Sequence, residues 1–277
     1  MTGCKIMELF DTHFHFSGEE SFEEFITRCQ ADLRTAGAGF APCPDRLLML
    51  CAGADHQESL RAQEFAARYP NVYFACGIHP HAAAEYLECP QDFSGFKNDR
   101  KLLAVGEIGL DYFYDFSDPA SQKKVLEEFL ELALQWQKPA MLHLRDKDDT
   151  FQAYRDALEM LTGFAGAGGR FVIHCYAGNR DYAEKFLALG GYFGVTGMYT
   201  FKAASNIREV ISQIPDDRLL IETDAPYLTP VPYRGKSNTP GMVALVARAL
   251  GCDRQMTPET AAELFTGNGK RFYQIGE

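Results

Sequence analysis

Short apolar runs recur along the whole chain, and amphipathic segments separate them. We expect the apolar runs to form eight strands, at residues 6–10, 47–51, 72–76, 102–105, 140–142, 171–173, 192–195 and 219–221. We expect the amphipathic segments to form helices, at residues 19–29, 56–69, 121–136, 150–161, 181–189 and 207–214. Between residues 121 and 136, Val125, Phe129, Leu132 and Trp136 recur at steps of three and four residues. That spacing predicts a helix with one buried face.

The alternation of strands and helices is typical of an α/β fold with a parallel sheet, because parallel strands need crossover connections. Eight such units predict a (β/α)8 barrel, or TIM barrel. An open doubly wound sheet more often has a glycine-rich phosphate turn after its first strand, and here that position reads Asp11-Thr-His-Phe-His15. No linker, charge block or longer repeat divides the chain, so we predict a single domain over residues 1–277.

Length and composition fit a globular protein. The chain has 277 residues, of which 46% are hydrophobic, and a domain of this size buries a core without disulfide bonds or structural metals. No apolar run approaches the roughly 18 residues that a membrane span needs, so we expect no membrane association. The first residues lack the basic and apolar regions of a secretory signal, and we therefore expect a cytoplasmic protein.

Cysteine usage and charge exclude two further classes. The eight cysteines include no Cys-x-x-Cys pair, and we expect them to be reduced and mostly buried rather than part of a disulfide framework or a structural zinc site. The net charge of -11 argues against a protein that coats nucleic acid, because such binding depends on the number of phosphates neutralised.

Metal-ligating side chains follow five of the apolar runs. Glu107 follows residues 102–105 and is flanked by Gly106 and Gly109, which allow a sharp turn and a close backbone approach. The other candidates in this position are His13, His15, His143, His174 and Asp224. In (β/α)8 barrels the active site lies at the carboxyl ends of the strands, so we expect these six side chains to converge.

These six side chains together predict a metal site. His13 and His15 are two residues apart, so their imidazoles point to the same side of an extended chain. Buried carboxylates and imidazoles are costly unless they are paired or bind a metal. Mixed ligands of this kind suit Zn, Mn, Fe or Co, and Mg where carboxylate and water dominate. Six ligands exceed the three that one catalytic ion usually takes, so we predict two divalent ions with Glu107 as the bridging carboxylate.

Four further side chains are candidates for binding substrate phosphate. His79 follows the third strand, and the alternative role is a histidine at a helix start beside Pro80. Arg145 lies two residues after His143, and the alternative role is a structural ion pair. Arg234 and Lys236 lie in the loop after the last strand, where barrels often bind phosphate; the alternative is solvated loop charge. Asp111 is expected to act in a turn or behind the ligands.

Six motifs resemble those of the TatD family of metal-dependent deoxyribonucleases, in the family's order and across nearly the whole chain. They are Asp11-Thr-His-Phe-His15, Gly106-Glu-Ile-Gly-Leu-Asp111, His143-Leu-Arg145, Ile173-His-Cys-Tyr176, Glu222-Thr-Asp-Ala-Pro-Tyr-Leu228 and Arg234-Gly-Lys236. The resemblance implies an amidohydrolase-type barrel with two divalent ions that hydrolyses phosphodiesters, usually in DNA. It also implies that the six candidate residues are the metal ligands. One departure is Val195-Thr-Gly197, where many members have a Ser-Gly pair.

The predicted function is therefore a metal-dependent phosphodiester hydrolase, a deoxyribonuclease that acts mainly at the ends of DNA or oligonucleotides. A metal-activated water would attack without a side-chain nucleophile. We expect Glu107 to bridge the ions and Asp224 both to bind one ion and to accept the proton of the water, so both are predicted to be catalytic.

Two alternatives stay open. The first is an amidohydrolase-like enzyme that cleaves C–N or ester bonds, for example by D-aminoacyl-tRNA deacylation. Many binuclear amidohydrolases have a carboxylated Lys where this chain has Glu107, which favours the nuclease. The second is a non-catalytic interaction scaffold, which missing ligands would favour, and none of the six is missing.

Overall fold

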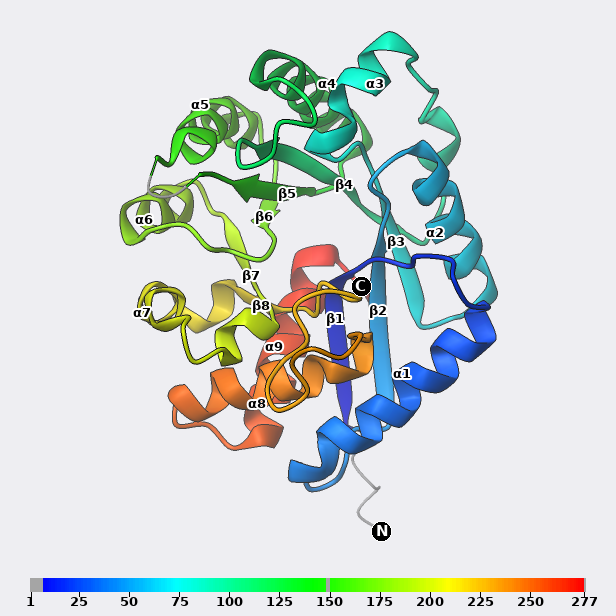
Figure 1. Cartoon of the computed structure of the whole chain (residues 1–277), viewed down its shortest axis with the longest axis vertical. Coiled ribbons are helices and arrows are strands. Elements are labelled where there is room, and N and C mark those ends of the chain that lie inside the picture. Colours follow the sequence, from blue (N-terminus) through cyan, green and yellow to red (C-terminus); the bar gives the residue numbers. More distant parts are fainter. Residues whose placement is uncertain (1–6, 148–149, 277) are drawn as a thin grey trace. The chain divides into compact units, whose positions relative to one another are not determined.

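The structure is a computed structural model that describes residues 7–147 and 150–276. Within these residues, eight strands form one sheet in the order β1 to β8 (Figure 1). The strands are β1 (Glu8–Phe14), β2 (Arg46–Ala52), β3 (Val72–Cys76), β4 (Leu102–Asp111), β5 (Ala140–Arg145), β6 (Phe171–Ile173), β7 (Tyr192–Val195) and β8 (Leu219–Ile221). All eight predicted strands are present, although Ile6, the predicted start of the first, lies outside the described residues. The predicted (β/α)8 fold is confirmed.

Helices alternate with these strands, as predicted. They are α1 (Phe22–Ala36), α2 (His56–Arg68), α3 (Ala83–Glu88), α4 (Pro119–Trp136), α5 (Gln152–Gly166), α6 (Arg180–Ala188), α7 (Ser205–Ser212), α8 (Val243–Asp253) and α9 (Pro258–Tyr273). The six predicted helical segments correspond to α1, α2, α4, α5, α6 and α7. The remaining three helices have no counterpart among those six segments.

The sequence around α4 shows why these helices form where they do. Asp118 is the N-cap, and its side chain accepts hydrogen bonds from the backbone amides of Ala120 and Ser121, which satisfies donors left open at a helix start. Pro119 occupies the first helical position, where its fixed φ is favourable. Of the predicted apolar face, Val125, Phe129 and Trp136 are buried, whereas Leu132 is half-buried. Local capping and a single apolar stripe together define this helix.

Contacts divide the chain into two compact units. We call Met1–Leu50, Gly194–Arg208 and Pro215–Glu277 the terminal unit, and Cys51–Phe193 with Glu209–Ile214 the central unit. The single domain expected from the sequence stays a prediction.

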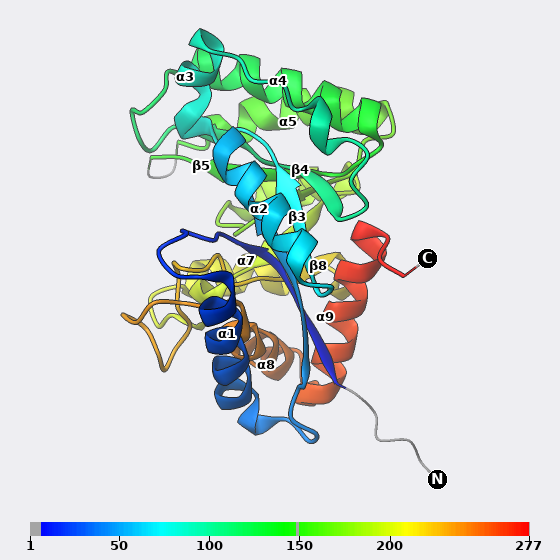
Figure 2. The same ribbon diagram turned by 90° about the vertical axis from the view of Figure 1, so that its right-hand side faces the viewer.

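In the terminal unit, the end of β1 lies beside the segment that follows β8, with a parallel bridge between Phe14 and Ala225. Helix α9 packs along β1 and β8 (Figure 2), where the rings of Phe10 and Tyr273 lie 5.9 Å apart. This packing fixes the carboxyl end of β1 against the residues after β8.

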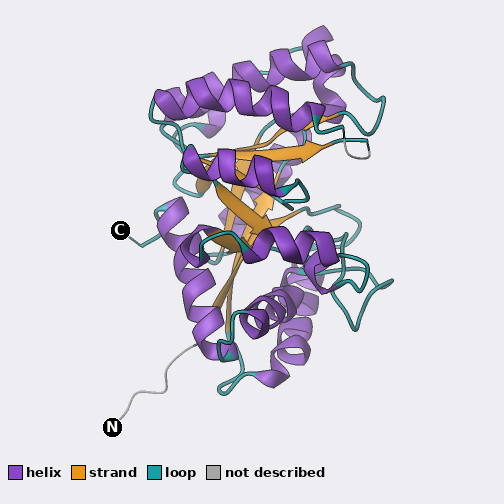
Figure 3. Ribbon diagram, turned by 90° about the vertical axis from the view of Figure 1, so that its left-hand side faces the viewer, coloured by secondary structure: helices purple, strands orange, loops and turns teal. Residues whose placement is uncertain are grey.

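In the central unit, β3 to β6 and the first two residues of β7 are parallel neighbours, and helices cover their outer side (Figure 3). Strand β4 is buried along its whole length and continues to Asp111. Glu107 therefore lies inside the strand, whereas the sequence placed it just beyond the strand's apolar run.

The sequence predicted reduced, mostly buried cysteines and no membrane-spanning segment. The seven described cysteines are free, but only Cys29, Cys51 and Cys76 are buried. The prediction that most cysteines are buried was therefore wrong. Among the described helices, none combines the length and the apolar character that a bilayer crossing requires.

Gly109 allows β4 and β5 to approach closely. It lies opposite His143 in the strand register and has φ +149°, a conformation that L side chains rarely adopt. A Cβ atom at this position would lie 1.9 Å from the carbonyl oxygen of His143. The close backbone approach that the sequence predicted for the glycines around Glu107 therefore requires a glycine at position 109. It fixes the position of His143 along β5 relative to Glu107.

Gly109→Ala should lower the free energy of unfolding by about 3 kcal/mol or more, through strained backbone and steric overlap. Urea unfolding followed by circular dichroism measures the change. Gly163→Ala is the matched control, because Gly163 lies in α5 with nothing near its missing Cβ. The control should gain about 0.5–1 kcal/mol. A Gly109→Ala protein as stable as the wild type would show that the strand pair tolerates a side chain here.

Candidate metal centre

A buried carboxylate joins β1 to the segment after β8 in the terminal unit. Asp11 accepts hydrogen bonds from the backbone amide of Thr223 at 2.8 Å and from its hydroxyl at 2.6 Å. Complete burial raises the pKa of Asp11 well above its ordinary value, although the hydrogen bonds from Thr223 act to lower it. The backbone amide of Asp224 donates to the carbonyl of His13 at 2.9 Å. These bonds place Asp224 beside the His-x-His motif.

His13, His15 and Asp224 form one group of ligand atoms, which we call the first ligand group. The Nε2 atoms of His13 and His15 lie 3.1 Å apart. Oδ1 of Asp224 lies 3.6 Å from Nε2 of His13 and 3.9 Å from Nε2 of His15. Ligand atoms bound to a tetrahedral ion at 2.0–2.1 Å lie about 3.3 Å from one another. The first ligand group therefore fits one divalent ion.

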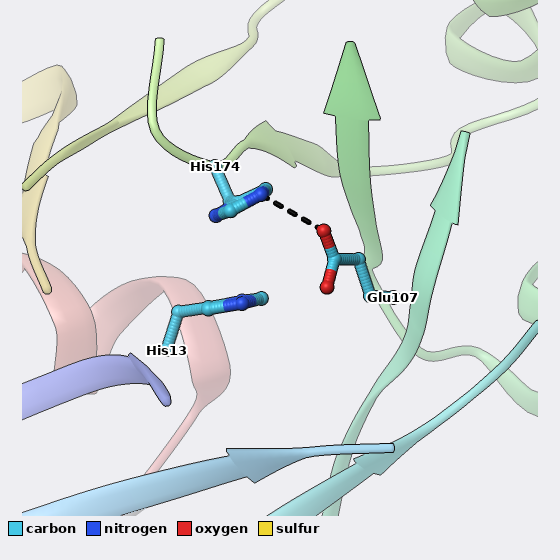
Figure 4. Close-up of side chains that lie close together, drawn as sticks. All are labelled: His13, Glu107 and His174. Atoms are coloured by element: carbon cyan, nitrogen blue, oxygen red, sulfur yellow. Dashed lines mark ion pairs between the residues drawn. The ribbon is translucent and has the colours of Figure 1, made fainter. Parts of the chain in front are cut away.

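Glu107, His143 and His174 form a tighter group in the central unit, which we call the second ligand group. Oε1 of Glu107 lies 2.9 Å from Nδ1 of His143 and 2.9 Å from Nε2 of His174. Figure 4 shows His174 and Glu107 pointing toward each other. The two histidine nitrogens are 3.3 Å apart, and Glu107 is 2% exposed. A carboxylate oxygen and two imidazole nitrogens this close together in a buried place need shared protons or a bound cation between them.

His143 is held from its other side by Asp111. Nε2 of His143 lies 3.1 Å from Oδ2 of Asp111, and Nε2 of His81 lies 2.8 Å from the same oxygen. An ionised carboxylate only accepts hydrogen bonds, so His143 donates from Nε2 to Asp111, and this bond holds Nδ1 facing Glu107. A carboxylate behind a histidine is a common means of orienting a metal ligand.

The pKa values of this pair depend on that contact. Burial acts to raise the pKa of Asp111, but the hydrogen bonds and charge of His143, together with His81, outweigh it and hold the pKa well below its usual range. Burial acts to lower the pKa of His143, but its hydrogen bonds to Asp111 and Glu107 raise it overall. Carboxylates on both sides of the imidazole therefore favour a positive charge at His143.

Asp111 is itself fixed by the start of α4. The side chain of Gln122 accepts a hydrogen bond from the amide of Asp111 at 2.7 Å and donates to its carbonyl at 2.9 Å. Both residues are almost completely buried. The orientation of His143 therefore depends on helix packing as well as on its own strand.

The predicted substrate contacts lie in different surroundings. His79 is near the second ligand group, with Nε2 3.8 Å from Oε1 of Glu107, so its position suits a ligand as well as a phosphate contact. Arg145 is exposed at the end of β5, with its guanidinium 4.2 Å from the ring centre of Phe113. Arg234 and Lys236 are exposed in the loop after β8 of the terminal unit, over the rings of Phe201 and Tyr233 respectively.

Asp111 lies behind His143 and in a turn, as the sequence predicted. The sequence did not identify the contact of His81 with Asp111, or the exposed rings of Phe113, Tyr114 and Phe116 after β4. The signal for the rings was present, because four aromatic residues in the five positions from Tyr112 to Phe116 are unusual in an exposed loop.

Comparisons with known proteins agree with the motifs. The model of the family described as TatD related DNase matches residues 10–274. The uncharacterized metal-dependent hydrolase YabD of Bacillus subtilis is 35% identical over 275 residues, which cover 96% of this chain and 99% of the relative. The 3'-5' ssDNA/RNA exonuclease TatD of Salmonella typhimurium is 30% identical over 234 residues, covering 82% and 87%. The crystal structure of YjjV, a TatD homologue from Escherichia coli, superimposes with a TM-score of 0.79 at 27% identity, covering 96% and 98%.

Asp111→Asn should weaken zinc binding about tenfold or more, because loss of the carboxylate behind a ligating histidine typically costs 10- to 100-fold in affinity. Competition with a chelating dye measures the affinity. Asp115→Asn is the control, since Asp115 is in the same loop but its side chain is 92% exposed. Equal zinc affinity in the two variants would contradict a positioning role for Asp111.

Proposed function

We propose that this chain, which belongs to the TatD related DNase family, removes nucleotides from the ends of single-stranded DNA by hydrolysing phosphodiester bonds. The family membership confirms the resemblance drawn from the sequence motifs, and it makes the chain a metal-dependent hydrolase. The observation that carries the proposal is the convergence of six imidazole and carboxylate ligands into two compact groups. A relative named as a 3'-5' ssDNA/RNA exonuclease supports a single-stranded substrate.

Each ligand group is proposed to hold one divalent ion. His13, His15 and Asp224 would hold one, and Glu107, His143 and His174 the other. Glu107 is proposed, from the sequence, to contribute to both ions as a bridging carboxylate. Nitrogen-rich ligand sets of this kind suit Zn or Mn, and Mg remains an alternative where water completes the coordination. His79 is near enough to Glu107 to join the second group.

Bound divalent ions supply positive charge that lowers the pKa of a nearby water and neutralises the phosphate. The protein's own contribution is to fix the ligands and to move one proton. Asp224 has two carboxylate oxygens, and Oδ1 faces the imidazoles of His13 and His15. We assign proton acceptance from the attacking water to Oδ2. As the water oxygen bonds to phosphorus, the bond to the leaving oxygen breaks, and Asp224 returns the proton to that oxygen.

Binding of the phosphate chain rests on a few local groups. The net charge of -11 repels long polyanions, so only the ions and local contacts favour the substrate. Arg145 is proposed to contact a phosphate near the second ligand group, and His79 is the second candidate there. Arg234 and Lys236 are proposed phosphate contacts of the terminal unit. So small a footprint suits an enzyme that acts at chain ends in preference to one that binds along the strand.

The C–N or ester hydrolase alternative has less support. Glu107 is 2% exposed and contacts two histidines, and a carboxylate at this position favours the nuclease over the binuclear amidohydrolases, many of which are expected to have a carboxylated lysine there. The scaffold alternative predicts eroded ligands, and all six are retained. Cytoplasmic location stays a prediction from the sequence.

A closed circular single strand tests the proposed function, because it offers the same phosphodiesters as its linear form without a terminus. With Mn²⁺ present, we expect the linear strand to be degraded and the circle to be cleaved at least 100-fold more slowly. Gel electrophoresis of samples taken over time measures both rates. Removal of the metal with EDTA should stop both. Asp224→Asn should slow the linear reaction about 10³-fold, if it removes about 4 kcal/mol of transition-state stabilisation.

Asp217→Asn serves as the control, since Asp217 is an exposed carboxylate of the same unit, in the 3-10 turn before β8. It should retain normal activity. Cleavage of the circle as fast as the linear strand would contradict the end requirement, and EDTA-resistant hydrolysis would contradict the metal-dependent mechanism.

A further inference from the structure

The segment between β4 and α4 exposes three large rings beside the second ligand group. Phe113 is 36% exposed, Tyr114 40% and Phe116 66%. The other large hydrophobic side chains with such exposure, among the described residues, are Leu60, Tyr227 and Val231. Exposure of several aromatic rings to water is unfavourable, and an exposed apolar cluster of this kind often marks a contact surface. We call Tyr114 and Phe116, with the adjoining Phe113, the aromatic platform.

The backbone of the platform is fixed. Oδ1 of Asp111 accepts hydrogen bonds from the amides of Phe113 and Tyr114 at 2.9 and 3.1 Å, a turn typical of an Asp side chain. At the other end, the hydroxyl of Ser117 donates to the carbonyl of His81 at 2.8 Å and accepts from the amide of Ala84 at 3.1 Å. Both anchors are buried. The exposed rings are therefore held in place before any ligand binds.

The rings also support one another. Tyr114 and Phe116 have ring centres 5.5 Å apart, and Phe113 lies 4.8 Å from Tyr114. The imidazole of His81 lies 4.6 Å from the ring of Phe116. Contacts at these distances are favourable for aromatic pairs. They leave the ring of Phe116 the most exposed of the three.

The platform is joined to the second ligand group by a short chain of contacts. His81 lies against Phe116 and bonds to Asp111, and Asp111 bonds to His143. The rings of His81 and His143 are 6.4 Å apart. A group bound on Phe116 therefore lies next to the place where the reacting phosphate is proposed to bind.

A positive charge accompanies the rings. The guanidinium of Arg145 lies 4.2 Å from the ring centre of Phe113 and 4.9 Å from that of Tyr114. It forms no ion pair with any carboxylate of residues 7–147 and 150–276. Exposed rings that adjoin a cation match a nucleotide, which combines a flat base with a charged phosphate. An apolar protein partner would offer no group to pair with the guanidinium of Arg145.

We propose that the aromatic platform is a stacking site for one unpaired nucleobase of the substrate, centred on Phe116 and Tyr114, with Arg145 neutralising the adjacent phosphate. The inference rests on the proposed function and names the feature by which the substrate would be recognised. Stacking accepts every base, because each has a flat face. It requires a base that is free of its duplex, so the platform selects single strands and frayed ends.

The test compares two oligonucleotides that differ only in their bases. The probes are an eight-residue oligothymidylate and the same backbone with abasic residues, each with a fluorescent label. Both probes have phosphorothioate linkages that resist hydrolysis, and binding to the metal-loaded protein is measured by fluorescence anisotropy, so that the result does not depend on turnover. The wild type should bind the oligothymidylate more tightly than the abasic probe.

Phe116→Ala should weaken binding of oligothymidylate about 5- to 150-fold, the range that one stacked base contributes, and leave binding of the abasic probe unchanged. Phe116→Trp should preserve the preference, because it retains a flat ring. Leu60→Ala is the control for loss of an exposed apolar side chain, since Leu60 is 42% exposed on α2, and it should have no effect.

Salt dependence separates stacking from charge. Phe116→Ala should leave the slope of log affinity against log salt unchanged, whereas Arg145→Ala should reduce its magnitude by about 0.7, the value for one phosphate of a single strand. Equal affinity of the wild type for both probes, or equal weakening of both by Phe116→Ala, would overturn the stacking site. If the wild type prefers bases but does not cleave DNA with Mn²⁺, the proposed function fails while the stacking site stands.

Discussion

The convergence of Glu107, His143 and His174 is the constraint on which the central unit depends. A carboxylate oxygen and two imidazole nitrogens lie between 2.9 and 3.3 Å from one another, and Glu107 is nearly inaccessible to water. Such an arrangement needs shared protons or a bound cation, because desolvated lone pairs and a buried carboxylate are otherwise unfavourable. The neighbouring features of the unit can be understood as the means of holding these three atoms together. The ligand atoms of the first ligand group also lie close together, at longer distances of 3.1 to 3.9 Å.

Neighbouring residues hold the second ligand group in place. Gly109 lets β4 and β5 approach so that His143 lies beside Glu107. Asp111 then fixes the imidazole from behind, and Gln122 of α4 fixes Asp111. The same Asp111 side chain organises the exposed segment after β4 through its second oxygen. One buried carboxylate thus couples ligand orientation to the shape of the surface on which we propose that a base stacks.

Much of this architecture could be predicted from the sequence, because the signals were local. Strands β6, β7 and β8 have the predicted bounds, since each is an apolar run between polar or glycine residues. Strand β4 extends six residues beyond its predicted end, because burial on both sides admits Glu107 and Gly109 into a strand that an apolar pattern alone would end. Helix α8 gave no amphipathic signal because it is buried on most sides. The ligand types and their places were predictable, whereas the contacts of Asp111 and the ring platform depend on tertiary packing.

The central claim is that the two ligand groups bind divalent ions. Anomalous diffraction from crystals soaked in Mn²⁺, collected on both sides of the manganese absorption edge, tests this claim most directly. The account predicts one strong peak within coordination distance of His13, His15 and Asp224, and a second within coordination distance of Glu107, His143 and His174. Manganese peaks confined to surface carboxylates, with none at either ligand group, would contradict it.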